Sequence, residues 1–332
     1  MEKSKNSNHS ILRLEENGMT LEISVVIPAY NAGKYIEECI NSVLEQKCSN
    51  LEVIVVDDCS TDNTRKIVSQ FDADIVKYIC LDKNFGGPSK PRNVGVKAAK
   101  GQYIVMLDAD DLLIDNSIQQ RIDILKADQE IACVFSDGKR FDESNGDHSG
   151  TFLSQHSYFI DLFEQYNQNT WVKFSSKDAY RTLAKGDYIL PSGLIVRKSV
   201  YDNIGLYDEC VTNSQDLDMS LRIAKTYPIA YLDITGFKQR VHASSISAQG
   251  YKLLENKIIL LKKNLIRSDD KVAISAFKCK ISENYTSLAY YYRMINNYKL
   301  AKEYYSNSLR YSRNLKAVKG WLFSSFAVYF NR

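Results

Sequence analysis

The sequence predicts an α/β protein with a mainly parallel sheet flanked by helices, followed by a small all-α module. Short β-branched runs alternate with segments of helical periodicity roughly every 25 residues in the first third of the chain, which is the pattern of βαβ units. Residues 251–332 have helical spacing and no strand pattern. We therefore expect a polar leading segment over residues 1–22, a sheet-containing domain over 23–250 and a helical module over 251–332.

The predicted strands of the parallel sheet are four β-branched runs, at residues 23–27, 51–56, 74–79 and 103–107. Helices are predicted between them, over residues 34–46, from Ile67 to Phe71 and from Asn93 to Ala99. Ser60 or Thr61 is expected to cap the second of these helices.

The most apolar of these strands ends at a cluster of carboxylates. Tyr103 to Leu107 is followed by Asp108, Asp110 and Asp111. Such a cluster is costly unless a positive charge occupies it, and hard oxygen ligands suit Mg²⁺ or Mn²⁺. The same residues could form the acidic first turn of a helix that continues into Leu112, because anions favour a helix N-terminus. These residues alone leave both interpretations open.

Polar segments follow all four predicted strands, namely Pro28–Asn31, Asp57–Asp58, Asn84–Pro88 and Asp108–Asp111. The carboxyl ends of parallel strands lie at one edge of an open sheet, so we expect these segments to meet there and to bind a ligand. The chain contains neither GxGxxG after the first strand nor GxxxxGK[ST]. A diphosphate would therefore be held by a metal and basic side chains, of which Arg92 is one candidate.

The remainder of the first domain is less regular. A helix around Ile118–Leu125 and a strand at 131–135 are predicted, and residues 142–176 are interpreted as a polar loop or insertion. Sheet-like composition returns at 188–197. A helix opens near Ser214 with Asp216 in its first turn, where an acidic residue can simply favour the helix N-terminus.

Composition excludes several classes of protein. Seven scattered Cys without paired spacing, four His and no HExxH or CxxC pattern argue against a disulfide framework and a zinc site. The first twenty residues lack an apolar stretch, so we expect no signal peptide, and no run is long enough to span a membrane. We expect a cytoplasmic protein that does not bind nucleic acid.

Residues 23 to about 245 resemble the inverting family 2 glycosyltransferases of the GT-A fold. The segments that carry the resemblance are Val26–Asn31, Val55–Asp62, Arg92–Asn93 before Gly101, Asp108–Asp110, Gln215–Asp216, and Arg240–His242 before Ser245. One departure is Gln215, which stands where the family more often has Glu. The resemblance implies a nucleoside-diphosphate-sugar donor, a UDP-sugar by expectation, with Mn²⁺ or Mg²⁺ as cofactor.

The resemblance also implies roles for individual residues. The donor would be bound by Pro28, Ala29, Tyr30, Asn31, Asp57, Asp58, Asn84, Arg92, Asp108, Ala109 and Arg240. The metal would be held by Asp110, with His242 as a second ligand. Asp216 would be the catalytic base, and Asp218 is its rival on the same helix. The acceptor would be a saccharide or a lipid-linked saccharide of the cell surface.

The helical module is basic and rich in tyrosine. Residues 251–332 hold 16 Lys and Arg against 5 Asp and Glu, and ten of the 22 Tyr. Its apolar residues from Tyr285 to Ser308 have the spacing of one tetratricopeptide-like unit. The segment from Leu315 to Phe330 combines basic and aromatic residues. It suits an anionic membrane surface, so that the enzyme would be peripheral on the plasma membrane, or else a core helix or a homo-oligomer contact.

Two other functions remain open on sequence alone. A sugar-phosphate nucleotidyltransferase also uses a nucleotide, a metal and an α/β fold, but its glycine-rich basic loop is missing after the first strand. A non-catalytic scaffold could retain the fold, although the presence of Asp108, Asp110 and Asp216 argues against this.

Overall fold

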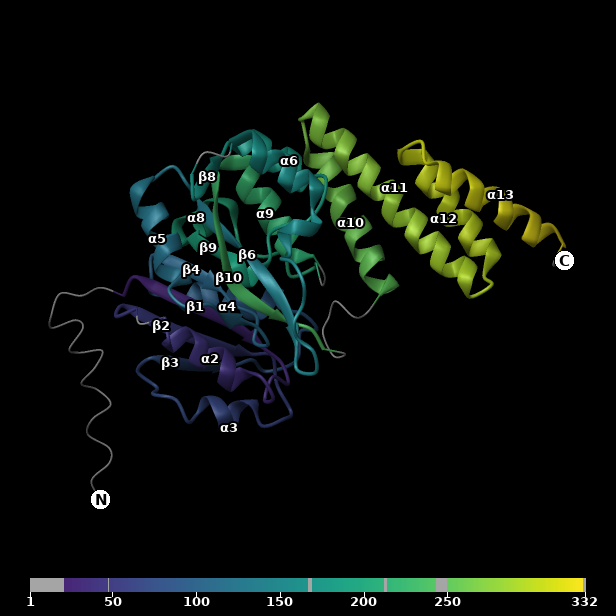
Figure 1. Cartoon of the computed structure of the whole chain (residues 1–332). Coiled ribbons are helices and arrows are strands. Elements are labelled where there is room, and N and C mark those ends of the chain that lie inside the picture. The colour runs from purple at the N-terminus through teal and green to yellow at the C-terminus, as the bar shows by residue number, and fades with distance from the viewer. Residues whose placement is uncertain (1–20, 47, 167–168, 212–213, 243–249, 331–332) are drawn as a thin grey trace, which may run out of the picture. The chain divides into compact units, whose positions relative to one another are not determined.

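The computed structural model describes residues 21–46, 48–166, 169–211, 214–242 and 250–330. The chain forms two compact units (Figure 1). The first contains residues up to Ala179, Tyr188–Thr212 and Arg222–Val241, and the second contains Tyr180–Asp187, Asn213–Leu221 and the chain from His242 onward. The second unit therefore includes two short segments that precede the predicted boundary at residue 250.

The first unit is built on a mixed sheet whose path, within the described residues, runs β3-β2-β1-β4-β9-β6-β10-β5 (Figure 1). Its first half comprises β1 (Ile23–Ala29), β2 (Leu51–Asp57), β3 (Val76–Cys80) and β4 (Tyr103–Met106). These four strands are parallel, with Val26 opposite Ile54 on one side and Met106 on the other. The four predicted strands are confirmed, and their carboxyl ends share one edge of the sheet.

The second half of the sheet adds antiparallel pairs. Its strands are β5 (Leu112–Leu113), β6 (Cys133–Asp142), β7 (Gly146–Asp147), β8 (Trp171–Phe174), β9 (Leu194–Arg197) and β10 (Ile229–Arg240). β9 pairs antiparallel with both β4 and β6, whereas β6 and β10 are parallel. β10 is absent from the sequence prediction, although it pairs with three other strands.

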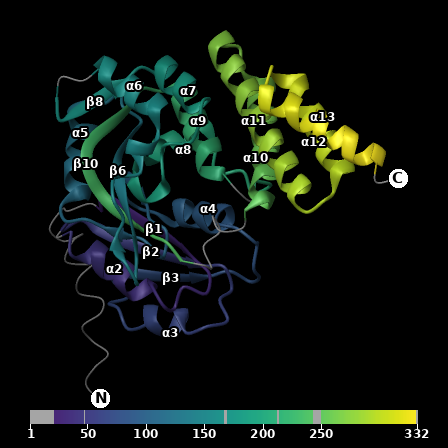
Figure 2. The same cartoon turned by 45° about the vertical axis from the view of Figure 1, so that its right-hand side comes forward.

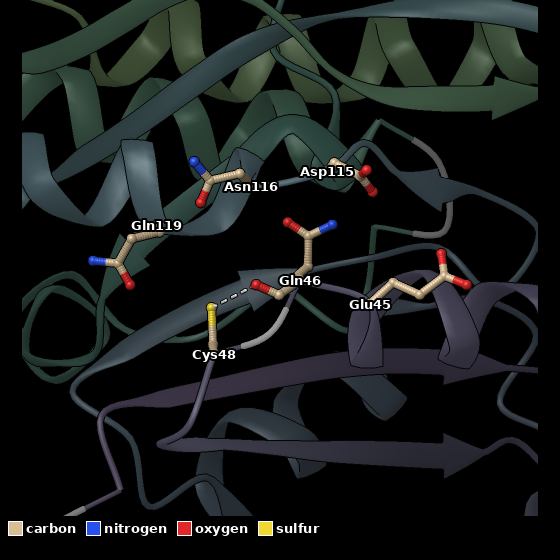
Figure 3. Close-up of a pocket in the computed structure, with 6 residues that line it drawn as sticks. All are labelled: Glu45, Gln46, Cys48, Asp115, Asn116 and Gln119. Atoms are coloured by element: carbon tan, nitrogen blue, oxygen red, sulfur yellow. Dashed lines mark hydrogen bonds between the residues drawn. The ribbon is translucent and has the colours of Figure 1, made fainter.

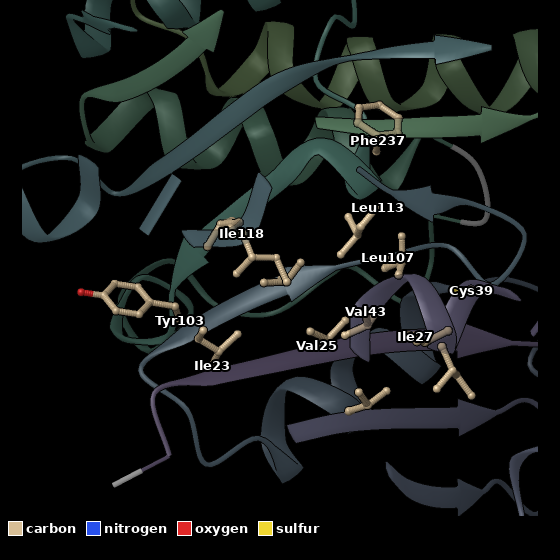
Figure 4. Packing of buried hydrophobic residues seen from close by; sticks show 14 of the residues in the cluster. Ile23, Val25, Ile27, Cys39, Val43, Tyr103, Leu107, Leu113, Ile118 and Phe237 are labelled. Carbon is tan, nitrogen blue, oxygen red and sulfur yellow. The ribbon is translucent and has the colours of Figure 1, made fainter. Parts of the chain in front are cut away.

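Helices cover the sheet, and those that lie entirely in the first unit are α2 (Ile36–Leu44), α3 (Thr64–Val68), α4 (Ser89–Ala98), α5 (Ser117–Ala127), α6 (Ser157–Tyr166) and α8 (Lys198–Ile204). Figure 4 shows Val25 and Ile27 of β1 in a buried cluster with Cys39 and Val43 of α2. Val26, on the opposite face of β1, is also fully buried. Burial on both faces explains why this strand consists mainly of apolar residues instead of alternating apolar and polar ones.

Residues 142–176, interpreted from the sequence as a polar loop or an insertion, are not a loop. This segment contains helix α6 and strand β8, and β8 pairs antiparallel with β10. The aromatic residues of the segment stabilise it. Phe159 of α6 packs against Phe135 of β6 and Tyr231 of β10, with ring centroids 5.9 and 5.0 Å away.

The second unit is helical, as predicted for its C-terminal part. It contains α10 (Tyr251–Arg267), α11 (Lys271–Met294), α12 (Tyr298–Tyr311) and α13 (Leu315–Phe330), and each packs on the next (Figure 2). Helices α7 (Ser176–Leu183) and α9 (Gln215–Thr226) are divided between the two units.

The predicted helix hairpin is formed by α11 and α12. Tyr285, Leu288 and Ala289 of α11 and Ala301 and Tyr305 of α12 are buried. The hydroxyl of Ser308 lies 2.8 Å from that of Ser282 across the hairpin. The helices are therefore confirmed, whereas their assignment to a tetratricopeptide-like unit stays a prediction.

Candidate active site

The carboxylate cluster is a tight turn after β4. The main-chain nitrogen of Asp111 donates to the main-chain oxygen of Asp108 at 3.0 Å, which closes the turn. The next residues, Leu112–Leu113, form strand β5 opposite Phe237 and Lys238. The first helix after the turn is α5, which begins at Ser117. The alternative interpretation of these aspartates as a helix cap is therefore excluded.

Asp111 anchors this turn from inside the protein. Its side chain is 3% exposed. One carboxylate oxygen accepts from the Ser192 hydroxyl at 2.6 Å, and the other accepts from the Arg240 main-chain nitrogen at 3.0 Å. Burial, followed by the charges of Asp110 and Asp108, raises the pKa of Asp111 well above its usual range. Asp111 is therefore a structural residue of the site.

Asp108 is paired with the buried side chain of Arg92. Arg92 Nη2 lies 2.7 Å from Asp108 Oδ1, and the guanidinium carbon lies 5.4 Å from the centre of the Tyr207 ring. Arg92 is only 2% exposed. It acts here as the counter-charge of Asp108, and a direct contact between Arg92 and a diphosphate stays a prediction.

Asn93, the neighbour of Arg92 on α4, holds the loop that precedes α9. Its side-chain amide accepts from the Tyr207 main-chain nitrogen at 2.8 Å and donates to the Tyr207 oxygen at 2.9 Å. It also donates to Glu209 at 2.9 Å. Arg92 and Asn93 together therefore connect the carboxylate turn to the loop at Tyr207–Glu209.

Arg240, at the end of β10, supports the carboxylate turn. Its Nε donates to the main-chain oxygen of Asp110 at 3.0 Å, and its Nη2 lies 2.5 Å from Glu38. The guanidinium lies between the rings of Tyr35 and Phe141, at 4.9 and 4.5 Å from their centres. Because Glu38 already neutralises this cation, the predicted contact with a diphosphate would require a rearrangement of that pair.

Asp58, at the end of β2, reaches the loop after β3. Its carboxylate accepts from the Phe85 main-chain nitrogen at 3.0 Å. Burial raises its pKa, and hydrogen bonds from Phe85 and Gly86 oppose that shift. Phe85 is 38% exposed, and Lys83 and Lys90 lie over its ring at 5.1 and 5.5 Å from the centre. An aromatic surface and two cations therefore lie beside the Asp58 carboxylate.

Hydrogen bonds also join the loops that follow β1 and β2. Asn31, in the left-handed region at φ 49°, donates its main-chain N–H to the Ser60 hydroxyl at 2.8 Å and accepts from the Thr61 main-chain nitrogen at 2.8 Å. Ser60 also donates its hydroxyl to Asp57, whose other oxygen accepts from Tyr78. Asp57 is thus occupied in shaping this turn.

The prediction that Ser60 or Thr61 caps the following helix is wrong. Helix α3 begins at Thr64, and its residue at the cap position, Asn63, makes no side-chain cap hydrogen bond. The Asp62 carboxylate accepts from the Thr64 main-chain nitrogen at 2.9 Å. Ser60 and Thr61 are unsuited to the cap because they bond to the neighbouring loops.

The other predicted residues fall in both units. Ala29 and Ala109 are buried, Pro28 is half-buried, Tyr30 is 50% exposed, and Asn84 is exposed with its side chain accepting from the Gly86 nitrogen. Asp216 and His242 belong to the second unit and are both half-buried. Ser245 lies outside the described residues.

The side chains fit a divalent cation that shares its ligands with a substrate. Among the described residues, no three His, Cys, Asp or Glu side chains form a metal-binding group of their own. A Mg²⁺ site commonly uses one or two carboxylates and takes its other ligands from phosphates and water. Asp110 and Asp108 lie in the same turn after β4, which therefore offers this number of carboxylates.

A surface hollow of about 450 Å³ lies apart from the predicted residues. It is lined by Glu45, Gln46, Cys48, Asp115, Asn116 and Gln119 (Figure 3). Gln46 donates to the Ile114 main-chain oxygen at 2.9 Å and so connects α2 to the segment before α5. None of the predicted site residues lines this hollow, so it is no part of the candidate active site.

Ser192 is the site residue that sequence reasoning missed. It is fully buried in a single 3₁₀ turn, Pro191–Gly193, and its hydroxyl accepts from the Asp108 main-chain nitrogen at 3.2 Å while donating to Asp111. Replacing Ser192 by Ala would remove the hydroxyl that bonds to the Asp108 main-chain nitrogen and to the buried Asp111 carboxylate. We expect the free energy of unfolding to fall by about 1–3 kcal/mol, as measured by urea denaturation.

The matched control for Ser192→Ala is Ser136→Ala. Ser136 is also buried, and its hydroxyl has no hydrogen-bond partner within the described part of the chain. Its replacement should change stability by less than the Ser192 substitution does. Equal losses in the two variants would show that the hydroxyl of Ser192 does not support the turn.

The fold agrees with what sequence comparison finds. The family model for glycosyl transferase family 2 matches residues 24–204, so the chain belongs to that family. The chain has the GT-A fold, followed by a C-terminal helical region. Family membership decides against the sugar-phosphate nucleotidyltransferase.

Several relatives extend this comparison. Glycosyltransferase GlyG of Streptococcus pneumoniae is 33% identical over 189 residues, which are 55% of this chain and 58% of GlyG. Poly(ribitol-phosphate) beta-N-acetylglucosaminyltransferase TarS of Staphylococcus aureus is 44% identical over 96 residues, 28% of this chain and 17% of TarS. The chain thus spans little more than half of GlyG and a smaller part of TarS.

Solved structures show the same fold. TarS residues 1–349 in complex with UDP-GlcNAc match with a TM-score of 0.59 and 20% identity, over 91% of this chain and 79% of that one. Mannosyltransferase PcManGT of Pyrobaculum calidifontis, in complex with GDP-Man and Mn²⁺, matches with a TM-score of 0.56 and 15% identity over 92% and 80% of the two chains.

Proposed function

We propose that this protein is an inverting hexosyltransferase that moves a sugar from a nucleoside-diphosphate sugar, a UDP-sugar by preference, to an acceptor hydroxyl. The observation that carries the proposal is the shared sheet edge. There the Asp58 carboxylate contacts the loop after β3, and the Asp108–Asp111 turn follows β4. A nucleotide and a charged diphosphate need contacts of these two kinds side by side.

The preference for UDP is supported by TarS, whose solved complex contains UDP-GlcNAc. PcManGT, with GDP-Man, has the same fold, so the fold alone does not select the base. In this chain the Phe85 ring offers a stacking surface beside Asp58, and the Asp58 carboxylate can accept hydrogen bonds from a base or a ribose. The predicted donor-binding residues of the β1 and β2 loops would complete this side of the site.

The chemistry requires charge stabilisation at the leaving group and a base at the acceptor. A divalent cation held by Asp110, with His242 as the predicted second ligand, would stabilise the negative charge that develops on the diphosphate. Asp216 would remove the proton of the acceptor hydroxyl as that oxygen attacks the anomeric carbon from the face opposite the diphosphate. A single displacement of this kind inverts the anomeric centre and uses no covalent enzyme intermediate.

The acceptor would be a saccharide or a lipid-linked saccharide of a cell-surface polysaccharide or glycoconjugate. TarS, by its name, transfers N-acetylglucosamine to a poly(ribitol-phosphate), so the acceptor of one relative is a polymer. We place the enzyme in the cytoplasm, peripheral on the inner face of the plasma membrane. Within the described residues, no helix has both the length and the apolar character needed to cross a bilayer.

A panel of nucleotide sugars tests the proposed function. Each donor is incubated with the enzyme and either Mn²⁺, Mg²⁺ or a chelator, and the release of nucleoside diphosphate is measured. We expect metal-dependent release from at least one UDP-sugar. Release from a GDP-sugar alone would show that the donor contains guanine instead of uracil. The absence of metal-dependent release from every donor, with and without saccharide acceptors, would support the non-catalytic scaffold.

Asp58→Asn should weaken the binding of UDP about tenfold or more, because a hydrogen bond to a charged group contributes about 1.5–3 kcal/mol. Asparagine keeps one oxygen that can accept from the Phe85 nitrogen, so the loop after β3 should retain its position. Isothermal titration calorimetry with free UDP measures the effect.

The control for this prediction is Asp82→Asn, an exposed carboxylate in the same loop region. Its affinity for UDP should equal that of the wild type. If Asp58→Asn also binds UDP with unchanged affinity, Asp58 only positions the loop and takes no part in donor binding.

A further inference from the structure

Helix α13 packs with its small residues and the partly buried Trp321 inward, whereas many of its other large apolar residues are exposed. Ala317 and Ser324 are fully buried and Gly320 is buried between them. A Cβ on Gly320 would lie 2.2 Å from the nearest atom of the Tyr305 ring of α12. Only a face without bulky side chains can approach that ring, so this side of α13 is fitted to α12.

The opposite side of α13 carries an apolar stripe, defined as Leu315, Val318, Leu322, Phe323, Phe326 and Tyr329. Their exposed fractions range from 39% for Val318 to 80% for Leu315. At 100° per residue most of these positions fall on one face of the helix. The contacts of α13 with its neighbouring helices are made by the small residues and by Trp321, which packs against the buried cluster around Tyr305. The alternative of a core helix therefore does not account for the exposed side chains of the stripe.

The stripe continues onto the neighbouring helices. The centre of the Phe323 ring lies 6.2 Å from the centre of the Tyr298 ring. The guanidinium carbon of Arg293 lies 5.3 Å from the centre of the Phe323 ring. Met294, the last residue of α11, and Ile295, which follows it, are 62% and 53% exposed. A contiguous apolar surface of this kind indicates a binding partner.

The charge around the stripe identifies the chemistry of that partner. Arg310, Arg313, Lys316 and Lys319 are all exposed, and the sequence from 304 to 330 contains no Asp or Glu. A symmetric contact with a second copy would bring these cations toward one another without acidic partners from the same segment. An anionic surface neutralises them and also accepts the apolar side chains.

We infer that the apolar stripe of α13 docks the protein on an anionic phospholipid bilayer, with the helix axis in the plane of the membrane. The 16 residues of α13 extend about 24 Å, less than the hydrocarbon thickness of about 30 Å. Phe and Leu enter the boundary between headgroups and acyl chains, and lysines contact the lipid phosphates. This inference rests on the proposed function, in which the enzyme is peripheral on a membrane, and names the surface that makes the contact. Its test measures membrane binding and requires no catalytic turnover, so the inference and the proposed function can fail separately.

The test is co-sedimentation of the full-length protein with vesicles of phosphatidylcholine, with and without phosphatidylglycerol. The wild type should sediment with the anionic vesicles, and Leu322→Glu/Phe326→Glu should bind them about tenfold or more weakly. Both side chains point outward, so the melting temperature should not change. The matched control is Ile266→Glu, which adds an acid at a residue of α10 that is 85% exposed, and it should bind like the wild type.

A second variant tests the electrostatic part without changing the apolar stripe. Lys316→Gln/Lys319→Gln should bind anionic vesicles about tenfold or more weakly and with less dependence on salt, because each basic residue near such a surface contributes about one decade or less in affinity. Light scattering gives the mass of every variant in solution. The inference is overturned if the wild type does not bind anionic vesicles, if the Leu322/Phe326 variant binds them equally well, or if that variant instead halves the mass of a dimer.

Discussion

Asp110→Ala should lower the rate of glycosyl transfer by about a hundredfold to a thousandfold, as expected when one group that stabilises developing charge is removed. The fold should persist, because the hydrogen bond from Arg240 goes to the main-chain oxygen of Asp110, which alanine keeps. The rate is measured as the release of nucleoside diphosphate in the presence of acceptor. The melting temperature is recorded in parallel.

Asp115→Ala is the matched control for this substitution. Asp115 is exposed and lines the hollow shown in Figure 3, apart from the carboxylate turn. Its replacement should leave turnover unchanged. Full activity of Asp110→Ala, or full activity of the wild type in the presence of a chelator, would falsify the assignment of Asp110 to the metal.

Asp216→Asn should lower turnover by about a hundredfold to ten-thousandfold, the contribution of a general base, while the affinity for the donor remains close to that of the wild type. Asparagine has nearly the same shape as aspartate but cannot accept the proton of the acceptor hydroxyl. Single-turnover kinetics with acceptor give the rate of transfer. Calorimetry with the nucleoside diphosphate gives the donor affinity.

Asp218 is the rival base, and the second unit distinguishes the two carboxylates. Residues i and i+2 of a helix point about 200° apart, so Asp216 and Asp218 face different surroundings. Asp218 is 1% exposed, and its carboxylate lies 3.9 Å from Lys263 Nζ on α10. Asp216 is half-buried. This difference in access supports Asp216 as the group that an acceptor can reach.

Asp218→Asn is accordingly expected to act on stability. It removes the buried partner of Lys263 and should lower the melting temperature, with a smaller effect on turnover per folded molecule. If Asp218→Asn abolishes transfer and Asp216→Asn does not, the base is Asp218 and the predicted roles of these two residues are exchanged.

The parallel half of the sheet was predictable because its strands are buried on both faces. Each of β1, β2 and β4 is then dominated by β-branched or aromatic residues, and this signal can be recognised without knowing which strands are its neighbours. The position of the polar segments at one sheet edge follows from the parallel direction of these strands. Asp58 and Asp108 were found in this way.

The antiparallel half was harder to predict. Strand β10 mixes buried and exposed residues, and its register with β6 shifts between Leu232 and Phe237. Its pairing partners come from β5, β6 and β8, which lie far apart in the sequence. The segment with α6 and β8 looked like a polar loop because its aromatic residues have no regular period until β10 supplies the surface on which they pack.

The sequence by itself determined which residue types are present: a carboxylate cluster after an apolar strand, and a helix at Leu315–Phe330 rich in both large and small residues. Tertiary structure decided how they are used. The aspartates form a turn because Leu112–Leu113 pairs with β10, and Ser192 and Arg240 hold Asp111 from distant elements. Helix α13 has one small and one large face, and periodicity cannot say which is buried. The Tyr305 ring decides this, because it leaves no room for a side chain at Gly320.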